Sequence, residues 1–529
     1  MTSIYTEPCD KEMILSGASD APCSRNQGRW ILAATILASS MAFIDGTVVN
    51  VALPFLQKQF NATVIGVQWV VEAYALFLSA LLLVGGALGD RYGRRRVFLI
   101  GVSLFALASV ACGLARNIDQ LILARAIQGI GGALLVPGSL AIISASFPPD
   151  QRGRAIGTWS GFSAITTAIG PVFGGWLIEH VSWRAVFFLN VPIAAAVLLI
   201  SLRHVPKMRA KSQSGKLDWV GASLITVGLA GVVYGLIDSS RVGFRAANVV
   251  LAFVLGVVCL IIFVFVESRV DNPMLPLRLF HSRNFTAANL LTLLLYAALS
   301  GSMFFLTLNL IQVQGFSATA AGAAFLPFVV IMFSLSRWSG GLVDRYGPRL
   351  PLIVGPVIAA IGLAMFALPG THARYWTGYF PGVVVLGFGM AVSVAPLTAT
   401  VMGSVAESQA GVASGTNNAV SRAAGLLAIA VLGVVMLQVF GRKLQSNLAN
   451  IHVTPATRSA VYKERIKLSG IQLPGNLSAA EEAELRSAVS QSFVAGYRTI
   501  MIIAAGLALL GAACTWALTS NTEASANDR

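Results

Sequence analysis

Long apolar runs constrain this sequence more than any other feature. Of its 529 residues, 56% are apolar and 11% are charged, which is more apolar sequence than one soluble core would use. Fourteen runs approach the length of about 20 residues that a transmembrane helix needs. We therefore predict an all-α polytopic membrane protein. The expected spans are residues 30–53, 68–88, 97–115, 119–143, 155–177, 184–203, 217–237, 248–267, 285–309, 318–340, 350–369, 377–402, 411–437 and 498–518.

A short turn between apolar runs occurs twice. Residues 85–96 read Gly-Gly-Ala-Leu-Gly-Asp-Arg-Tyr-Gly-Arg-Arg-Arg, and the Asp-Arg-Tyr-Gly core at 90–93 returns at 344–347. Arginines cannot enter hydrocarbon, so each turn lies at a membrane surface. Eight expected spans separate the two copies, and because eight is even both copies face the same side. The sequence is therefore an internal duplication.

This arithmetic predicts fourteen transmembrane helices arranged as six, two and six. The predicted parts are a tail at 1–29, an N-terminal six-helix bundle at 30–203, a polar linker at 204–216, an inserted helix pair at 217–267, a C-terminal six-helix bundle at 268–518 with a long outer segment at 441–497, and a tail at 519–529. Ser478 followed by Glu481 predicts a capping box that opens a helix running into the last span. The outer segment is either a lid over the outer mouth or a solvated connector.

Charge in the short loops predicts how the chain is oriented. With the N-terminus inside, short inner segments hold roughly eighteen Lys and Arg against roughly six in short outer loops. The positive-inside rule then places both termini in the cytoplasm and the chain in the cytoplasmic membrane. Much of the net charge of +15 belongs to these loops, and since no recognition module is present we expect no nucleic-acid partner.

Ionisable side chains lie inside three spans of the N-terminal half. Asp45 lies about 22 Å from the inner end of span one and Arg125 about 9 Å from the outer end of span four, so in a bilayer about 30 Å thick their depths coincide. Glu72, about 6 Å from the outer end of span two, lies slightly higher. Such groups are costly in hydrocarbon and mark a function by default. We predict that Asp45, Glu72 and Arg125 form a proton-coupling cluster. The alternative for Asp45 and Arg125 is a structural ion pair, and the alternative for Glu72 is a side chain at the outer rim that reaches water.

Three motifs resemble those of a known family. Span one contains Phe-Ile-Asp-Gly-Thr-Val-Val-Asn-Val-Ala-Leu-Pro at 43–54, and span four places an arginine before several glycines at 121–133. With the turn at 86–95, these resemble signatures of the fourteen-span drug/proton antiporter branch of the major facilitator superfamily. The resemblance implies two bundles that rock around a central site. It also implies a latch between the bundles on the inner side, formed by Asp90, Arg91, Gly93, Arg94, Asp344 and Arg345.

Span five carries Ala-Ile-Gly-Pro-Val-Phe-Gly-Gly-Trp at 168–176. This stretch is similar to the motif that distinguishes antiporters within the superfamily, and the resemblance implies a hinge that favours export. Pro171 removes a backbone hydrogen bond, while Gly170, Gly174 and Gly175 allow helices to pack closely. The alternative for span five is an ordinary packing seam between helices. The alternative for the latch is a basic turn that only sets the topology of the chain.

Polar and aromatic side chains within the spans are candidates for lining a substrate cavity. These are Asn50, Tyr74, Gln128, Phe162, Asn309, Asn417, Asn418 and Arg422.

The pattern as a whole indicates a proton-coupled exporter of hydrophobic or amphipathic compounds. Export of one metabolite, lipid or siderophore is an alternative, and a membrane sensor is an alternative of another class. The sequence holds no His-Glu-x-x-His, Gly-x-Ser-x-Gly or phosphate-binding glycine loop, so we expect neither an enzyme nor an ATP-driven pump. We expect no cofactor and no metal. The expected partners are membrane lipid, a small-molecule substrate and protons, with the chain acting as a monomer.

Overall fold

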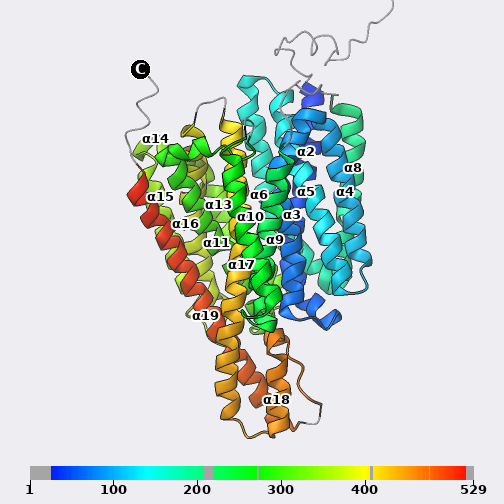
Figure 1. The fold of residues 1–529 in the computed structure, drawn as a ribbon, viewed down its shortest axis with the longest axis vertical. Coiled ribbons are helices and arrows are strands. Elements are labelled where there is room, and N and C mark those ends of the chain that lie inside the picture. Colours follow the sequence, from blue (N-terminus) through cyan, green and yellow to red (C-terminus); the bar gives the residue numbers. More distant parts are fainter. Residues whose placement is uncertain (1–24, 207–217, 271–272, 406–408, 476, 520–529) are drawn as a thin grey trace, which may run out of the picture.

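The computed structural model describes residues 25–206, 218–270, 273–405, 409–475 and 477–519. All regular secondary structure in these residues is helical. Twelve of the described helical segments are long and apolar enough to cross a membrane. Two more helices, α6 (Pro149–His180) and α15 (Arg349–Met365), run beside them in the bundles (Figure 1). Each of the fourteen predicted spans therefore coincides with one helix or with one broken pair of helices.

The first six spans form an N-terminal bundle. Besides α6, it contains α2 (Arg25–Gln59), α3 (Val64–Tyr92), α4 (Arg94–Leu114), α5 (Ile118–Ser146), α7 (Trp183–Phe188) and α8 (Asn190–His204). Within the bundle, α6 packs on α2, and α5 packs on both α3 and α4. The last predicted span of this bundle, 184–203, is broken in two, because the chain turns at Leu189 between α7 and α8.

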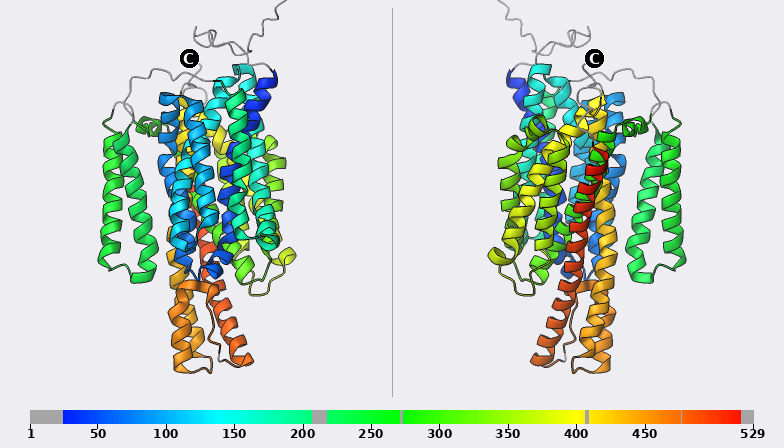
Figure 2. Two further views of the ribbon diagram at one scale, coloured as in Figure 1. Left: turned by 90° about the vertical axis from the view of Figure 1, so that its right-hand side faces the viewer. Right: turned by 90° about the vertical axis from the view of Figure 1, so that its left-hand side faces the viewer.

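An antiparallel helix pair, α9 (Trp219–Val242) and α10 (Ala247–Glu267), follows the first bundle. The pair stands on the flank of the molecule (Figure 2), and α9 contacts α3 and α17 (Ala410–Ala449). It thus covers a place where the two bundles meet. Most of the predicted linker, residues 207–216, lies outside the described residues.

The C-terminal bundle contains α15, α17 and the remaining spans. These are α11 (Arg283–Gln312), α12 (Ala318–Ala323), α13 (Leu326–Gly340), α16 (Phe380–Gly403) and α19 (Ala479–Leu518). Short helical segments connect them: η1 (Leu277–His281), α14 (Leu342–Tyr346) and η2 (Tyr375–Tyr379). The predicted span 318–340 is broken between α12 and α13, where Pro327 stands in the first turn of α13.

Helices in equivalent positions of the two bundles make equivalent contacts. The pairs α2·α6, α3·α5 and α4·α5 correspond to α11·α17, α13·α16 and α15·α16. The two basic turns also match: the Arg91 guanidinium lies over the Tyr92 ring, as Arg345 does over Tyr346. Each turn ends at a glycine with positive φ, a conformation that side chains disfavour: φ is 97° at Gly93 and 72° at 347. The predicted duplication is confirmed in three dimensions.

The predicted outer segment, 441–497, is largely helical. α17 and α19 each have 40 residues, so each is about 60 Å long and outreaches a hydrocarbon layer about 30 Å thick. Both project from one end of the bundle, where α18 (Pro455–Lys463) and η4 (Glu464–Gly470) join them (Figure 1). We call this the α18 end. The opposite end, where α2 begins and α19 ends, is called the terminal end.

The start of α19 confirms the predicted capping box. Ser478 Oγ accepts a hydrogen bond from the Glu481 N–H, and the Glu481 carboxylate accepts from the Ser478 N–H at 2.8 Å. Replacing Ser478 with Ala should cost about 1 kcal/mol at this helix end. We expect faster amide exchange in the first turn of α19, measured by mass spectrometry. Ser487→Ala, an exposed position in the same helix, is the control; equal exchange in the two variants would contradict the assignment.

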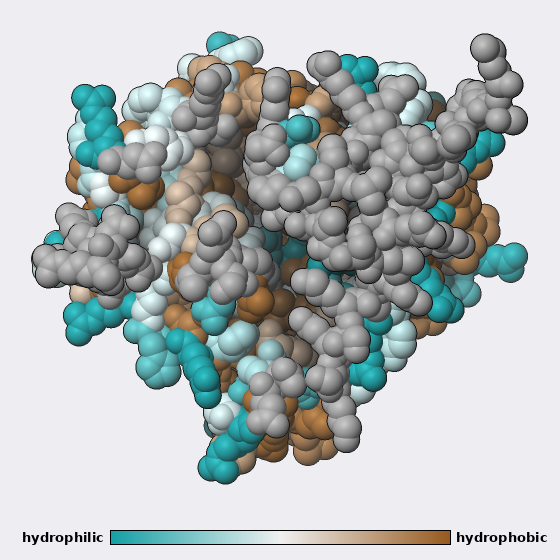
Figure 3. Space-filling model, turned by 90° about the horizontal axis from the view of Figure 1, so that it is seen from above, coloured by the Kyte–Doolittle hydropathy of each residue, from teal (hydrophilic) through white to brown (hydrophobic). Residues whose placement is uncertain are grey.

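The surface agrees with a chain that spans a bilayer. Seen from the terminal end, hydrophilic side chains stand mainly around the rim of the visible face, with apolar ones between them (Figure 3). The flanks include many exposed large apolar residues, such as Leu107, Leu251 and Ile261. These side chains would face lipid, since a bilayer rather than water surrounds the middle of each span.

Candidate functional site

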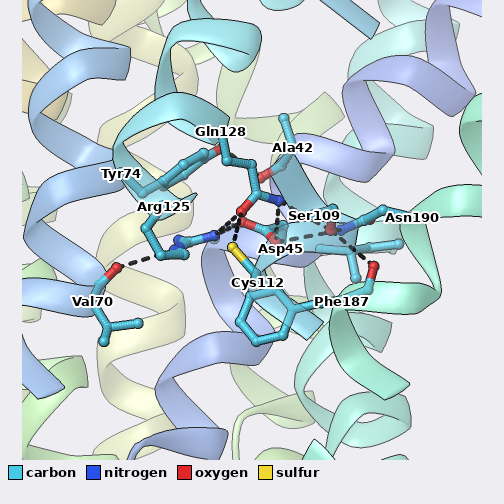
Figure 4. Close-up of polar contacts among 12 residues, drawn as sticks. Ala42, Asp45, Val70, Tyr74, Ser109, Cys112, Arg125, Gln128, Phe187 and Asn190 are labelled. Carbon is cyan, nitrogen blue, oxygen red and sulfur yellow. Dashed lines mark hydrogen bonds and ion pairs between the residues drawn. The ribbon is translucent and has the colours of Figure 1, made fainter. Parts of the chain in front are cut away.

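A buried ion pair lies within the N-terminal bundle. Arg125 Nη1 of α5 lies 2.5 Å from Asp45 Oδ2 of α2, and each residue is 1% exposed (Figure 4). The guanidinium also donates through Nε to the Val70 carbonyl of α3 at 3.0 Å, and it lies 4.2 Å from the centroid of the Tyr74 ring. The predicted match in depth between Asp45 and Arg125 is confirmed as a direct contact. The pair holds α2, α3 and α5 together.

Polar side chains from α4, α5 and α8 complete this cluster, which we call the Asp45 cluster. Gln128 Nε2 donates to Asp45 Oδ1 at 2.9 Å, and Gln128 Oε1 accepts from Arg125 Nη1 at 2.8 Å. Asn190 Nδ2 reaches Asp45 Oδ1 at 3.4 Å and Ser109 Oγ at 2.9 Å. Gln128, Asn190 and Ser109 are all buried. A change in the charge of Asp45 would therefore be felt by five helices at once.

Two members of this cluster were not predicted from the sequence. Asn190 stands in an apolar run directly before Val191 and Pro192, so the rule that singled out Asp45, a polar group within hydrocarbon, applied to it equally. Ser109 gave no comparable signal, because a serine in a span commonly bonds its own helix backbone. Here its hydroxyl donates across to the Phe187 carbonyl at 2.8 Å.

Glu72 does not join the Asp45 cluster. Both of its carboxylate oxygens are buried without a hydrogen-bond partner among the described residues, and the residue is 0% exposed. The same face of α3 carries Gln68, whose amide donates to the Ile429 carbonyl of α17 at 2.9 Å. Glu72 thus stands on the face that meets the C-terminal bundle. The prediction of one three-charge cluster was wrong, and so was the alternative of a side chain reaching water at the rim.

The glycines of span five pack on two partners. A Cβ at Gly170 would lie 2.7 Å from Thr47 Oγ1 of α2, and one at Gly174 would overlap the Val48 side chain. On another face, a Cβ at Gly175 would lie 2.5 Å from the Ala318 carbonyl oxygen of α12. In the opposite direction, a Cβ at Gly322 of α12 would overlap the Pro171 carbonyl. The motif therefore joins α2 to α6 within one bundle, and α6 to α12 across the two bundles.

Hydrogen bonds tie the bundles together toward the α18 end. The Glu179 carboxylate of α6 accepts from Thr319 N at 2.8 Å and from Thr319 Oγ1 at 2.7 Å. Gln57 at the end of α2 accepts from Gln312 Nε2 at 2.9 Å and donates to the Lys467 carbonyl of η4 at 2.8 Å. The segment between α17 and α19 thus rests against the N-terminal bundle.

The predicted latch residues lie at the terminal end. Asp90 pairs with Arg94 at 2.8 Å, and Arg94 also donates to the Ala141 carbonyl of α5 at 3.1 Å. These contacts remain within the N-terminal bundle, so the pair does not bridge the bundles in this arrangement. Arg345 lies over its neighbouring tyrosine, and the side chain of Asp344 lies outside the described residues.

Most predicted cavity residues are engaged inside one bundle. Tyr74 and Gln128 belong to the Asp45 cluster. Asn309 is fully buried and donates to the Tyr379 hydroxyl at 2.7 Å, while Asn417 donates to Thr292 Oγ1 at 2.7 Å. The Asn50 amide reaches the carbonyl of residue 46 in its own helix at 3.5 Å. Asn50 and Asn417 are partly exposed, whereas Tyr74, Gln128 and Asn309 are buried; their assignment to a substrate cavity stays a prediction.

Phe162 lies on an exposed face of α6, and its assignment to a substrate cavity stays a prediction. It is 49% exposed and shares one face of α6 with Ile165, Ile169, Phe173 and Trp176, which are exposed as well. An apolar exposed stripe of this kind is what a helix presents to lipid. Among the polar residues of the predicted set, Asn418 is the most exposed, and Arg422 is partly exposed without a hydrogen bond to a described residue.

Known proteins similar to this chain are transporters. Tetracenomycin C resistance and export protein of Streptomyces glaucescens is 32% identical over 503 residues, covering 94% of this chain and 93% of the relative. Multidrug resistance protein Stp of Mycobacterium tuberculosis is 32% identical over 478 residues, covering 89% of this chain and 88% of the relative. Puromycin resistance protein pur8 of Streptomyces alboniger is 36% identical over 411 residues, with 77% and 81% covered.

Solved structures share the fold at low sequence identity. A bacterial homologue of the human lysosomal transporter Spinster, in an inward-facing and unoccupied conformation, has a TM-score of 0.62 at 19% identity, with 94% of this chain and 99% of that chain covered. The POT family transporter PepTSo has a TM-score of 0.60 at 13% identity, with 94% of this chain and 100% of that chain covered. The family model described as Major Facilitator Superfamily matches residues 35–429. The chain is therefore a multi-pass membrane transporter, not an enzyme, and it belongs to the major facilitator superfamily.

Proposed function

We propose that the protein is a proton-coupled antiporter that exports hydrophobic or amphipathic compounds across the cytoplasmic membrane by alternating access. The observation that carries the proposal is the buried pair of Asp45 and Arg125, an ionisable contact at the junction of several spans. The names of the relatives, which include export and resistance proteins, support efflux. The proposal places the chain in the fourteen-span branch that its motifs resemble.

Protonation of Asp45 is the proposed coupling step. The neutral carboxyl would hold Arg125 less tightly, while the guanidinium would keep its bonds to Val70 and Gln128. The cationic guanidinium then lacks its buried counter-charge, and the packing of α2 against α5 and α8 becomes less favourable. A local charge change would in this way alter the balance between two arrangements of the bundles.

A short physical route leads from Asp45 to the other bundle. Val48 lies three residues after Asp45 in α2 and contacts Gly174. The next glycine, Gly175, contacts the backbone of α12 at Ala318. A shift of α2 relative to α5 would therefore be transmitted through α6 to the seam between the bundles, because these contacts leave no space for a side chain.

The proposed orientation places the terminal end in the cytoplasm, as the basic loops require. The α18 end is then outside, and the bonds that Glu179 and Gln57 make across the bundles close the outer side. The arrangement described is consequently the one that receives substrate from the cytoplasm.

Exchange can be measured with purified protein in sealed liposomes that enclose a pH-sensitive dye and are acidic inside. The transported substrate is a second, amphipathic dye added outside. Transporter molecules whose cytoplasmic face points outward should move this dye into the lumen while protons leave the lumen. A protonophore should abolish the accumulation, and empty liposomes are the control. Accumulation that persists without a pH gradient would contradict proton coupling. Competition among compounds in this assay separates a broad exporter from an exporter of one metabolite, lipid or siderophore.

A further inference from the structure

One face of α17 is directed toward α3 and contacts it at two heights, with a stretch between them that is open. Residues 415, 418, 422, 429 and 433 share this face through helical spacing of three, four and seven. At one height Gln68 of α3 contacts this face, since a Cβ at Gly433 would lie 2.8 Å from its side chain. At another height Leu83 lies 3.5 Å from where a Cβ at Gly415 would be. Asn418 and Arg422 lie between these two contacts.

The two residues between the contacts remain open. Asn418 is exposed, and its amide donates only to the Ser414 carbonyl of its own helix at 3.1 Å. Arg422 is partly exposed, and its guanidinium has neither a hydrogen bond nor an ion pair with any described residue. It lies about 18 Å along α17 from the terminal end of that helix, which is deep within a bilayer about 30 Å thick.

The described acidic groups near this face form no ion pair with Arg422. Asp45 is already paired with Arg125, so the Asp45 cluster contributes no spare negative charge. Glu72 lies on the facing side of α3, but it is fully buried and forms no ion pair with Arg422. A guanidinium held deep in the membrane without a counter-ion is costly. An anion arriving from outside the protein would remove that cost.

We propose that Arg422, with Asn418 beside it, recognises the acidic group of a substrate. This inference rests on the proposed efflux function and narrows it to compounds that carry a carboxylate, phenolate or enolate on a hydrophobic frame. The planar guanidinium offers several donors in a fork that matches a carboxylate, and the Asn418 amide can donate one more bond. The substrate's apolar frame would lie against the surrounding spans.

Binding tests this subsite without requiring transport. The probe is 1-pyrenebutanoate, with its methyl ester as an uncharged twin, titrated by fluorescence anisotropy into protein held in zwitterionic lipid nanodiscs. Arg422→Gln should weaken binding of the acid about tenfold or more, as expected for loss of a charge-assisted hydrogen bond, and leave the ester unchanged. Arg422→Lys should fall between, because it keeps the charge without the fork. Arg442→Gln, at an exposed position of the same helix, is the matched control.

Equal losses for acid and ester, or a wild type that binds both alike, would overturn the subsite. An anionic lipid headgroup has the same chemistry, so the titration is repeated with phosphatidylglycerol in the nanodiscs. If the acid binds in zwitterionic lipid but not in nanodiscs with phosphatidylglycerol, Arg422 binds a lipid headgroup. That result would also overturn the proposal. Acid binding without proton exchange in liposomes would contradict the proposed antiport while leaving the subsite intact.

Discussion

Asp45→Asn is expected to reduce proton-driven efflux to the level of empty vesicles. The asparagine keeps the size of the side chain but cannot gain or lose a proton in the working pH range, so the coupling step is removed. The measurement is substrate accumulation and proton release in the liposome assay with an imposed pH gradient. Asp238→Asn is the matched control, since Asp238 is also buried and ion-paired, to Arg241 at 2.9 Å, but lies in the inserted helix pair. Proton-dependent transport by Asp45→Asn would remove this residue from coupling.

The alternative, a structural ion pair, predicts a different pattern of stability. Removing one partner of a buried pair leaves an uncompensated charge and typically costs about 3–5 kcal/mol. Arg125→Gln and Asp45→Asn should therefore each lower the thermal unfolding temperature. The double variant should regain most of the loss, because no charge stays unpaired. If the stable double variant also regains proton-driven transport, the pair is structural; if it remains inactive, its loss of function cannot be assigned to unfolding.

The sequence located the Asp45 cluster by depth but could not complete it. Counting residues from the ends of the spans fixes the height of a side chain, and for Asp45 and Arg125 that was sufficient. It says nothing about rotation around the helix axis. Glu72 has nearly the right height, yet it lies on the face of α3 that meets α17, away from the pair.

Rotation also decides which polar side chains of a span can line a cavity. Asn309 and Asn417 were chosen because they interrupt apolar spans, and the same property drives each of them to bond inside the bundle. By contrast, the repeated turn predicted the duplicated packing well, since both halves must bury equivalent faces. The latch could not be predicted in the same way. Whether Asp90 and Arg94 act across the bundles depends on the arrangement of the bundles, and a motif does not specify that arrangement.

Gly175→Ala is expected to open the α18 end and to slow transport. The added Cβ would lie 2.5 Å from the Ala318 carbonyl oxygen and 2.7 Å from Thr319 N, and these backbone atoms of α12 cannot rotate away. Overpacking of this kind costs about 1–3 kcal/mol in the arrangement that contains the contact, which corresponds to a shift of about fivefold to 150-fold toward an arrangement without it. The Glu179 bonds to Thr319 cross the same seam and should break with it.

Two glycines of the same helix separate this effect from general damage to α6. A Cβ at Gly174 would press on the Val48 side chain within the N-terminal bundle, so Gly174→Ala should lower stability without biasing the two arrangements. A Cβ at Gly157 meets nothing within 4 Å, and Gly157→Ala should behave as wild type. Spin labels at Val181 and Leu368, both exposed at the α18 end, report the separation of the bundles. A longer distance between the two labels in Gly175→Ala alone would identify Gly175 as the residue through which α6 controls the outer closure. Equal distances in all three variants would leave span five as an ordinary packing seam.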